Sequence, residues 1–102
     1  MDRMAVLKEI LEQSPDDAFA RYGLALEYSN QGNLEQAMEE FGKLLATHPD
    51  YTPGYFMAGQ ALARAERTEE ARTMLRDGIA SADRTGNAHA KAEMEALLAE
   101  LG

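Results

Sequence analysis

The stretch that decides the fold is residues 24–49, LALEYSNQGNLEQAMEEFGKLLATHP. Its second half places apolar side chains at i, i+3, i+4, i+7, i+10 and i+11, the spacing of one face of an amphipathic helix. These side chains belong to Leu34, Ala37, Met38, Phe41, Leu44 and Leu45. Gly32 and Asn33 stand just before them; glycine suits the left-handed turn that ends a helix, and asparagine caps the next one. The stretch therefore predicts two helices joined by a tight turn.

The apolar pattern of this stretch returns at an interval of 34 residues, which separates Ala37 from Ala71. The same interval links further pairs: Leu7 with Phe41, Ile10 with Leu44, Leu11 with Leu45, Pro15 with Pro49, Tyr22 with Phe56, Ala25 with Gly59 and Phe41 with Leu75. A period of this length filled by two helices is typical of stacked helical hairpins. Because one hairpin cannot bury its apolar face alone, we expect neighbouring hairpins to share one core.

The composition agrees with an all-α chain. Alanine occurs 18 times and leucine 12 times, whereas valine and isoleucine together occur three times. Unbranched side chains suit helices, and β-branched ones suit strands. Helix-breaking and capping residues interrupt the pattern at Ser14-Pro15-Asp16-Asp17, at His48-Pro49-Asp50, at Thr52-Pro53 and at Thr85-Gly86-Asn87. We expect six antiparallel helices of about 11–16 residues each.

Several of these residues resemble the consensus of the tetratricopeptide repeat (TPR) family. In one register they are Leu24, Ala25, Tyr28, Gly32, Ala37, Phe41 and Pro49, and in the next Tyr55, Ala58, Gly59, Leu62, Ala71 and Leu75. The resemblance implies a right-handed helical-repeat superhelix that forms a single domain over residues 1–102. It divides this domain into an N-terminal half-repeat helix (2–13), repeat 1 (18–51), repeat 2 (52–85) and a C-terminal capping helix (87–101).

Four residues depart from the family pattern. Arg21 stands where the family has a large apolar residue, Leu44 and Gly78 stand where it prefers alanine, and Glu66 stands where it has glycine. If Glu66 takes the left-handed conformation that glycine takes in this turn, its Cβ costs roughly 1 kcal/mol.

The resemblance also implies a function, which is to bind a peptide or helix of a partner protein in a concave groove lined by the first helix of each unit. On this sequence the implied groove residues are Phe19, Tyr22, Gly23, Leu26, Asn30, Phe56, Met57, Gln60 and Arg64. A largely apolar set of this kind favours an amphipathic helix or an extended apolar peptide. Arg64 is the one cation in this set, and a single cation is not enough to clamp the carboxylates of the acidic chaperone tails that other members of the family bind.

Two alternatives stay open for this apolar surface. The C-terminal helix could cover it, or a second copy of the chain could do so. The second case would make the protein a structural module, an oligomerisation or scaffold domain that forms a homodimer through the same surface.

Charge and missing motifs disfavour several other function classes. The net charge of −8 repels nucleic acid and anionic membranes; it suits either a salt-loving source or, more simply, solvated helix faces rich in glutamate. The chain has no cysteine and no glycine-rich phosphate loop, so we expect no cofactor. His89 and Glu93 share a helix face, but two side chains do not make a metal site. We expect no metal and no catalytic residue, and hence a protein that is not an enzyme.

The N-terminal segment 1–9 carries charges throughout and lacks the apolar block of a signal peptide. No stretch approaches the roughly 18 apolar residues that span a bilayer. We therefore expect a cytoplasmic protein.

Overall fold

The computed structural model describes residues 2–102 and contains six helices and no strand within that range. The helices are α1 (Arg3–Gln13), α2 (Ala18–Asn30), α3 (Leu34–Thr47), α4 (Thr52–Arg64), α5 (Thr68–Thr85) and α6 (Ala88–Glu100). The predicted all-α fold and the number of helices are confirmed. The predicted range of lengths was wrong for α5, which has 18 residues because nothing interrupts it before Gly86.

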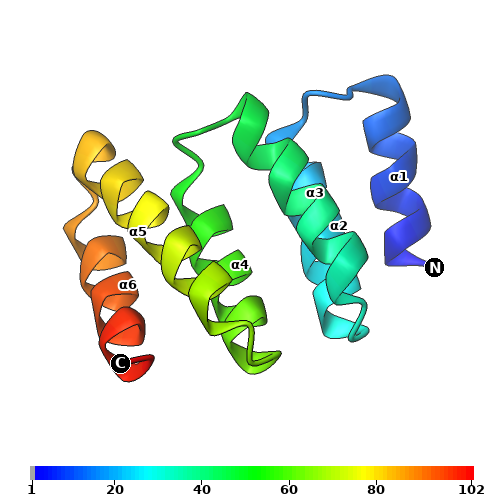
Figure 1. The fold of residues 1–102 in the computed structure, drawn as a ribbon. Coiled ribbons are helices and arrows are strands. Elements are labelled where there is room, and N and C mark those ends of the chain that lie inside the picture. Colours follow the sequence, from blue (N-terminus) through cyan, green and yellow to red (C-terminus); the bar gives the residue numbers. More distant parts are fainter. Residues whose placement is uncertain (1) are drawn as a thin grey trace.

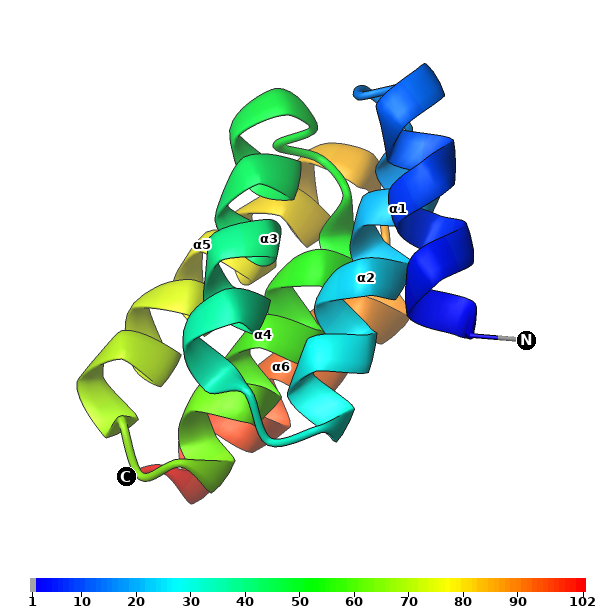
Figure 2. The ribbon, with the colours of Figure 1, turned by 90° about the vertical axis from the view of Figure 1, so that its right-hand side faces the viewer.

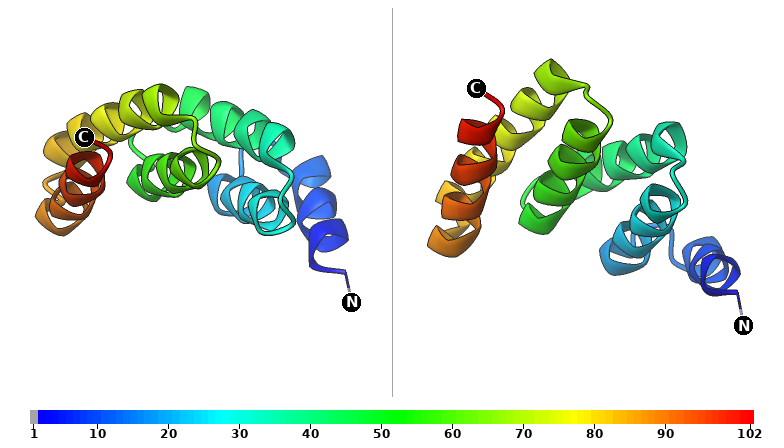
Figure 3. Two further views of the ribbon diagram at one scale, coloured as in Figure 1. Left: turned by 60° about the horizontal axis from the view of Figure 1, so that its bottom comes forward. Right: turned by 90° about the horizontal axis from the view of Figure 1, so that it is seen from below.

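The helices form a two-layered arc (Figure 1). Helix α2 packs mainly against α3, and α4 packs mainly against α5, so that each pair is an antiparallel hairpin. In Figure 3 (left), α2, α4 and α6 lie on the inner side of the arc, and α3 and α5 lie on its outer side. Helix α6 packs against both α5 and α4, and α1 packs against α2 at the other end (Figure 2). No helix between residues 2 and 102 has the length and apolar character needed to cross a membrane.

Side-chain caps and glycines set the ends of most helices. A side-chain oxygen of Asp17 accepts a hydrogen bond from the amide of Ala20 at 2.9 Å, and Asn87 accepts one from Ala90 at 3.0 Å. Asn33 accepts from Gln36 at the start of α3. Gly32 has a φ of 77° in the turn before α3, a conformation that glycine adopts without steric cost. These local contacts explain why the chain reverses direction where the sequence predicts it.

Small residues allow the helices of each pair to approach closely. Ala25, Ala37, Ala58 and Ala71 are all fully buried, although they are the smallest side chains in the core. The large side chains between the helices, Phe41, Leu44 and Leu75, are fully buried as well. Small and large residues thus alternate across the contacts, as close packing requires.

The most restrictive of these contacts surrounds Gly78 on α5. A Cβ atom at this position would lie 2.5 Å from the sulfur of Met94 on α6 and 2.5 Å from the Cβ of Tyr55 on α4. Met94 is itself fully buried. Glycine therefore replaces the alanine of the family pattern because three helices meet here with no room for a methyl group.

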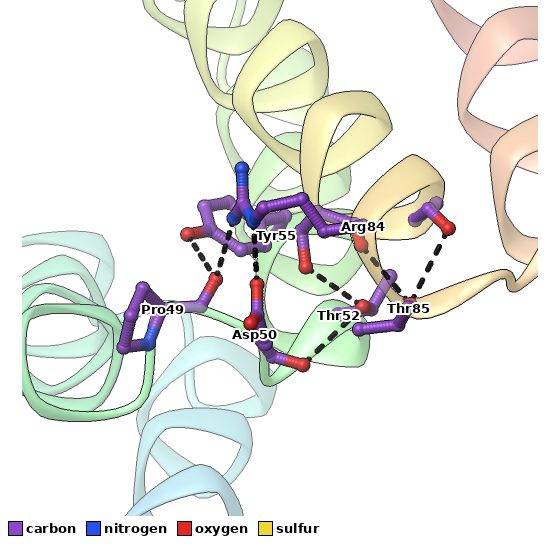
Figure 4. Close-up of polar contacts among 8 residues, drawn as sticks. Pro49, Asp50, Thr52, Tyr55, Arg84 and Thr85 are labelled. Carbon is purple, nitrogen blue, oxygen red and sulfur yellow. Dashed lines mark hydrogen bonds and ion pairs between the residues drawn. The ribbon is translucent and has the colours of Figure 1, made fainter.

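A network of polar contacts joins the loop between α3 and α4 to α5 (Figure 4). The hydroxyl of Tyr55 donates to the carbonyl of Pro49 at 2.7 Å, and Arg84 donates to the carboxylate of Asp50 at 2.8 Å. The hydroxyls of Thr52 and Ser81 form a buried hydrogen bond of 2.8 Å. The Arg84–Asp50 bond joins α5 to the loop that follows the first helical pair, and the Thr52–Ser81 bond joins the two helices of the second pair.

Glu66 lies in the turn between α4 and α5 with a φ of 63°, and it is the one non-glycine residue with positive φ among residues 2–102. The left-handed conformation considered for this position is confirmed. The Glu66 side chain is exposed, and the structure gives it no ion pair within the described range. Its backbone strain is therefore not offset by a side-chain contact.

We predict that Glu66→Gly preserves stability or raises the melting temperature by up to roughly 4–8 °C, because glycine removes a strain of about 1 kcal/mol. Thermal unfolding followed by circular dichroism measures this change. The matched control is Glu95→Gly in the exposed interior of α6, where glycine lowers the melting temperature because it weakens the helix. A clear loss of stability in Glu66→Gly would contradict the strain argument.

We predict opposite effects for two Gly→Ala substitutions. Gly42→Ala stabilises the protein by about 0.5–1 kcal/mol, because Gly42 lies in α3 with no atom within 4 Å of the new methyl group. Gly78→Ala destabilises it by about 1–3 kcal/mol, because the new methyl group overlaps Tyr55 and Met94. Urea denaturation of both variants gives the two values. Equal changes in the free energy of unfolding would mean that the space around Gly78 accepts a methyl group.

Candidate functional site

The inner layer carries four apolar side chains of α2 and α4, three of which pack on one core cluster, whereas Phe19 is placed with them by the helical spacing of α2. They are Phe19, Tyr22 and Leu26 of α2 and Met57 of α4, and we call them the α2–α4 seam. Tyr22, Leu26 and Met57 are half-buried and pack against the core around Ala25 and Ala58. Phe19 lies in the first turn of α2 and is 72% exposed. The seam is therefore an apolar strip whose inner part is anchored in the core and whose end projects into solvent.

Tyr22 is held in place by a second aromatic ring. Its ring centroid lies 5.3 Å from that of Tyr51, with the planes tilted by 53°. This geometry is favourable for aromatic pairs. Burial, and then the nearby Tyr51, raise the pKa of Tyr22, so its hydroxyl stays neutral at physiological pH. Tyr51 belongs to the loop before α4, and the loop thus fixes one side of the seam.

Gly23 does not belong to this surface, and its assignment to the groove was wrong. It is buried against α1, where an added Cβ would lie 3.3 Å from a methyl carbon of Leu7. The physical reason is the helical period, since residue 23 points about 100° away from residue 22. Gly23 serves the packing of α1 on α2.

The remaining residues of the implied groove lie along or beside α4. Phe56 is half-buried against the cluster of Tyr55, Leu75, Ala82 and Met94, which joins α4 to α5 and α6. The C-terminal helix thus contributes to the surroundings of Phe56 but not to the apolar cluster that surrounds the seam. Gln60 is half-buried, and Asn30 is exposed at the end of α2.

Arg64 is the last residue of α4, whereas Phe19 lies in the first turn of α2. Its guanidinium donates to the hydroxyl of Ser29 at 3.5 Å, and both residues border a shallow hollow of about 200 Å³ with Leu34 and Ala61. None of the four seam side chains lines this hollow. The surface therefore offers a long apolar strip and one hydrogen-bonding end.

Sequence reasoning missed Ser29 and Tyr51. Ser29 follows Tyr22 and Leu26 at helical spacing, so the period of α2 could have found it. Tyr51 had no such signal, because it lies in a loop and the residue one period earlier is Asp17. Its contact with Tyr22 depends on how the loop folds back.

The two histidines, His48 and His89, each have a polar neighbour in the structure. Within residues 2–102 no group of three histidine, aspartate or glutamate side chains is placed to hold a metal ion. The ring of His89 lies 3.2 Å from Glu93, but this pair is exposed and has no third ligand. His48 instead lies 3.0 Å from the carbonyl of Asp16, where it links two loops. Each histidine thus has one polar contact, His89 with a carboxylate on its own helix and His48 with a backbone carbonyl.

A comparison with known families decides the classification. The sequence model of the family described as tetratricopeptide repeat matches residues 4–53 of this chain and again residues 28–101. The chain belongs to the tetratricopeptide repeat family. Such TPR domains commonly form protein-interaction modules, and the fold is generally non-catalytic.

Relatives of similar length support this classification. A TPR repeat-containing protein of Pseudomonas aeruginosa is 30% identical over 95 residues, which is 93% of this chain and 90% of that protein. The solution structure of a TPR domain protein from Salinibacter ruber is 31% identical, with a TM-score of 0.79 over 86% of this chain and 89% of that one. The TPR fold of the present chain is thus shared by proteins of much the same size.

A more distant structure shows the fold alone. PcrH, solved in complex with the chaperone binding region of PopD, superimposes with a TM-score of 0.88 at 16% identity, covering 96% of this chain and 74% of that one. The six-helix arrangement therefore persists where the sequence has diverged strongly.

We predict that the two aromatic residues of the α2–α4 seam differ in their contribution to stability. Phe19→Ala changes the free energy of unfolding by less than about 0.5 kcal/mol, because the ring is largely exposed. Tyr22→Ala lowers it by about 1–3 kcal/mol, because the ring packs on the core and on Tyr51. Urea denaturation measures both. A large loss in Phe19→Ala would show that the ring has a structural partner.

Proposed function

We propose that this TPR domain binds a segment of a partner protein along the inner side of its arc, and that the α2–α4 seam supplies the main apolar contacts. The segment is an amphipathic helix or an extended apolar peptide. Leu26 and Met57 form the floor of the binding surface, Phe19 and Tyr22 flank it, and Gln60 and Arg64 supply hydrogen bonds. The proposal includes no catalytic step.

The exposure of Phe19 is the observation that carries this proposal. A phenylalanine that is 72% exposed in the first turn of a helix adds little to folding. Burying such a ring against a partner is worth roughly 1.5–3 kcal/mol. Because Phe19 continues a strip of three half-buried apolar side chains, a partner that covers it also gains the rest of the strip.

The fold supports the proposal independently. TPR domains commonly bind proteins, and PcrH was solved with a bound segment of PopD. The present chain shares this arrangement of helices.

The charges of this surface favour an apolar segment over an acidic one. Arg64 is the one cation among the residues assigned to the surface, and it already donates to Ser29. An acidic tail would meet this single guanidinium and an otherwise anionic protein of net charge −8. Apolar contacts therefore have to supply most of the binding energy.

We predict that Phe19→Ala weakens binding of the partner about tenfold or more, because it removes the exposed anchor without disturbing the core. Partners captured from the source organism by the wild-type domain are identified, and the affinity of the bound segment is then measured by titration. Ile10→Ala is the matched control, because Ile10 is 40% exposed but lies on α1. Its affinity stays within about twofold of the wild type.

Two results would contradict the proposal. If Phe19→Ala and Ile10→Ala weakened binding of the segment equally, any exposed apolar side chain would contribute to binding, and the α2–α4 seam would not be the binding surface. A dimer that dissociates on dilution in light scattering, and that Phe19→Ala converts to a monomer, would assign the seam to self-association. The domain would then be the oligomerisation or scaffold module of the alternative hypothesis.

A further inference from the structure

A hollow of about 380 Å³ lies between α3 and α5 on the outer side of the arc. Its position separates it from the α2–α4 seam, since α3 and α5 form the outer layer (Figure 3, left). The volume is at the low end of the roughly 300–1,000 Å³ that ligand pockets span. A hollow of this size accepts one or two side chains of a partner.

The floor of the hollow is apolar. Leu62 of α4 is 1% exposed and forms its base, and the half-buried Met38 and Met74 form its walls. Methionine side chains are flexible and polarizable, so they adapt to apolar side chains of different shapes. The floor thus suits an aliphatic or aromatic side chain.

The rim of the hollow is acidic. Glu69, Glu70 and Asp77 line it, and no lysine or arginine does. Glu70 and Glu69 make ion pairs with Arg67 and Arg72, one turn away on the same helix, whereas Asp77 is in no ion pair within residues 2–102. The side chain of Glu69 remains 81% exposed. Carboxylates around an apolar floor are complementary to cations that flank an apolar side chain.

The first unit shows that the fold does not require such a surface. Tyr28 and Glu40 occupy the positions of Leu62 and Met74, one interval of 34 residues earlier. There the ammonium group of Lys8 lies 5.8 Å from the centre of the Tyr28 ring, and Glu40 is paired with Arg21 at 2.6 Å. The corresponding hollow is therefore lined by charges of both signs. The apolar floor with its acidic rim is specific to the second unit.

We propose that this outer hollow is a second docking surface, and that it binds a cationic amphipathic helix of a partner protein. A helix lies in the groove between α3 and α5 and places an apolar side chain on Met38, Leu62 and Met74. Lysine or arginine residues on either side of that side chain pair with Glu69 and Asp77. The net charge of −8 steers such a helix toward the domain.

The test uses a fluorescent synthetic peptide whose leucines form one helical face and whose lysines form the other. Its binding to the whole domain is measured by fluorescence anisotropy at low and at moderate salt. Asp77→Lys is expected to weaken binding about five- to tenfold, because it replaces attraction by repulsion at the rim. Met74→Gln, with folding checked by circular dichroism, is expected to weaken it several-fold because it makes the floor polar.

The matched control is Glu9→Lys, which changes the net charge equally on the exposed face of α1, at the other end of the arc (Figure 1). The expected change is less than about twofold. Equal weakening by Glu9→Lys and Asp77→Lys would overturn the proposal, because net charge alone would then explain binding. It would also be overturned if the peptide failed to bind, or if a peptide with serine in place of leucine bound equally well.

Phe19→Ala separates the two surfaces. It is expected to leave the affinity of the cationic peptide unchanged, because Phe19 belongs to α2 on the inner layer. A large loss in this variant would place the peptide on the α2–α4 seam and overturn the outer site. Conversely, a failure of the seam to bind its own partner would leave the result for the outer hollow unaffected.

Discussion

The close approach of paired helices is the constraint on which the rest of this structure depends. At Gly59 of α4, a Cβ atom would lie 2.6 Å from a methyl carbon of Leu75 on α5, so the two helices meet with nothing between them but that side chain. In the first unit Ala25 and Phe41 stand at the same two positions and are fully buried. This contact holds the two helices of each hairpin at close distance, so a larger residue at position 25 or 59 would force them apart. The placement of both surfaces follows from it.

The sequence predicted most of the fold because the signals that determine it are local or periodic. The interval between Ala37 and Ala71 predicted the repeated hairpin, and Asn33 and Gly32 predicted a turn that the structure shows with its cap and its positive φ. The same reasoning assigned the side chains that make up the α2–α4 seam. Phe19, Tyr22 and Leu26 lie on one face of α2, as a period of 3.6 residues predicts, whereas Met57 comes from α4.

Contacts between non-periodic segments could not be predicted in this way. The helical period could have excluded Gly23 from the seam, since Gly23 points about 100° away from Tyr22, whereas the position of Tyr51 against Tyr22 depends on the path of a loop. The same holds for Arg21, whose polar side chain the family pattern does not predict. Its ion pair with Glu40 replaces apolar packing between α2 and α3 by a half-buried charged contact. Such a pair is specific in geometry and adds little net stability.

Helix α1 has a consequence for the motions of the molecule. Among the described residues it packs on α2 alone, through Leu7 and Leu11, which are each 8% exposed. Two further contacts with α2 lie nearer the surface, the pair of Arg3 with Glu27 and the ammonium group of Lys8 over the Tyr28 ring. Within the described residues, the helix with the fewest packing contacts separates from its neighbours at a lower free energy than the densely packed ones. Detachment would uncover Leu24 while α4, α5 and α6 stay folded. Among the six helices, α1 is therefore the one expected to open at the lowest free energy.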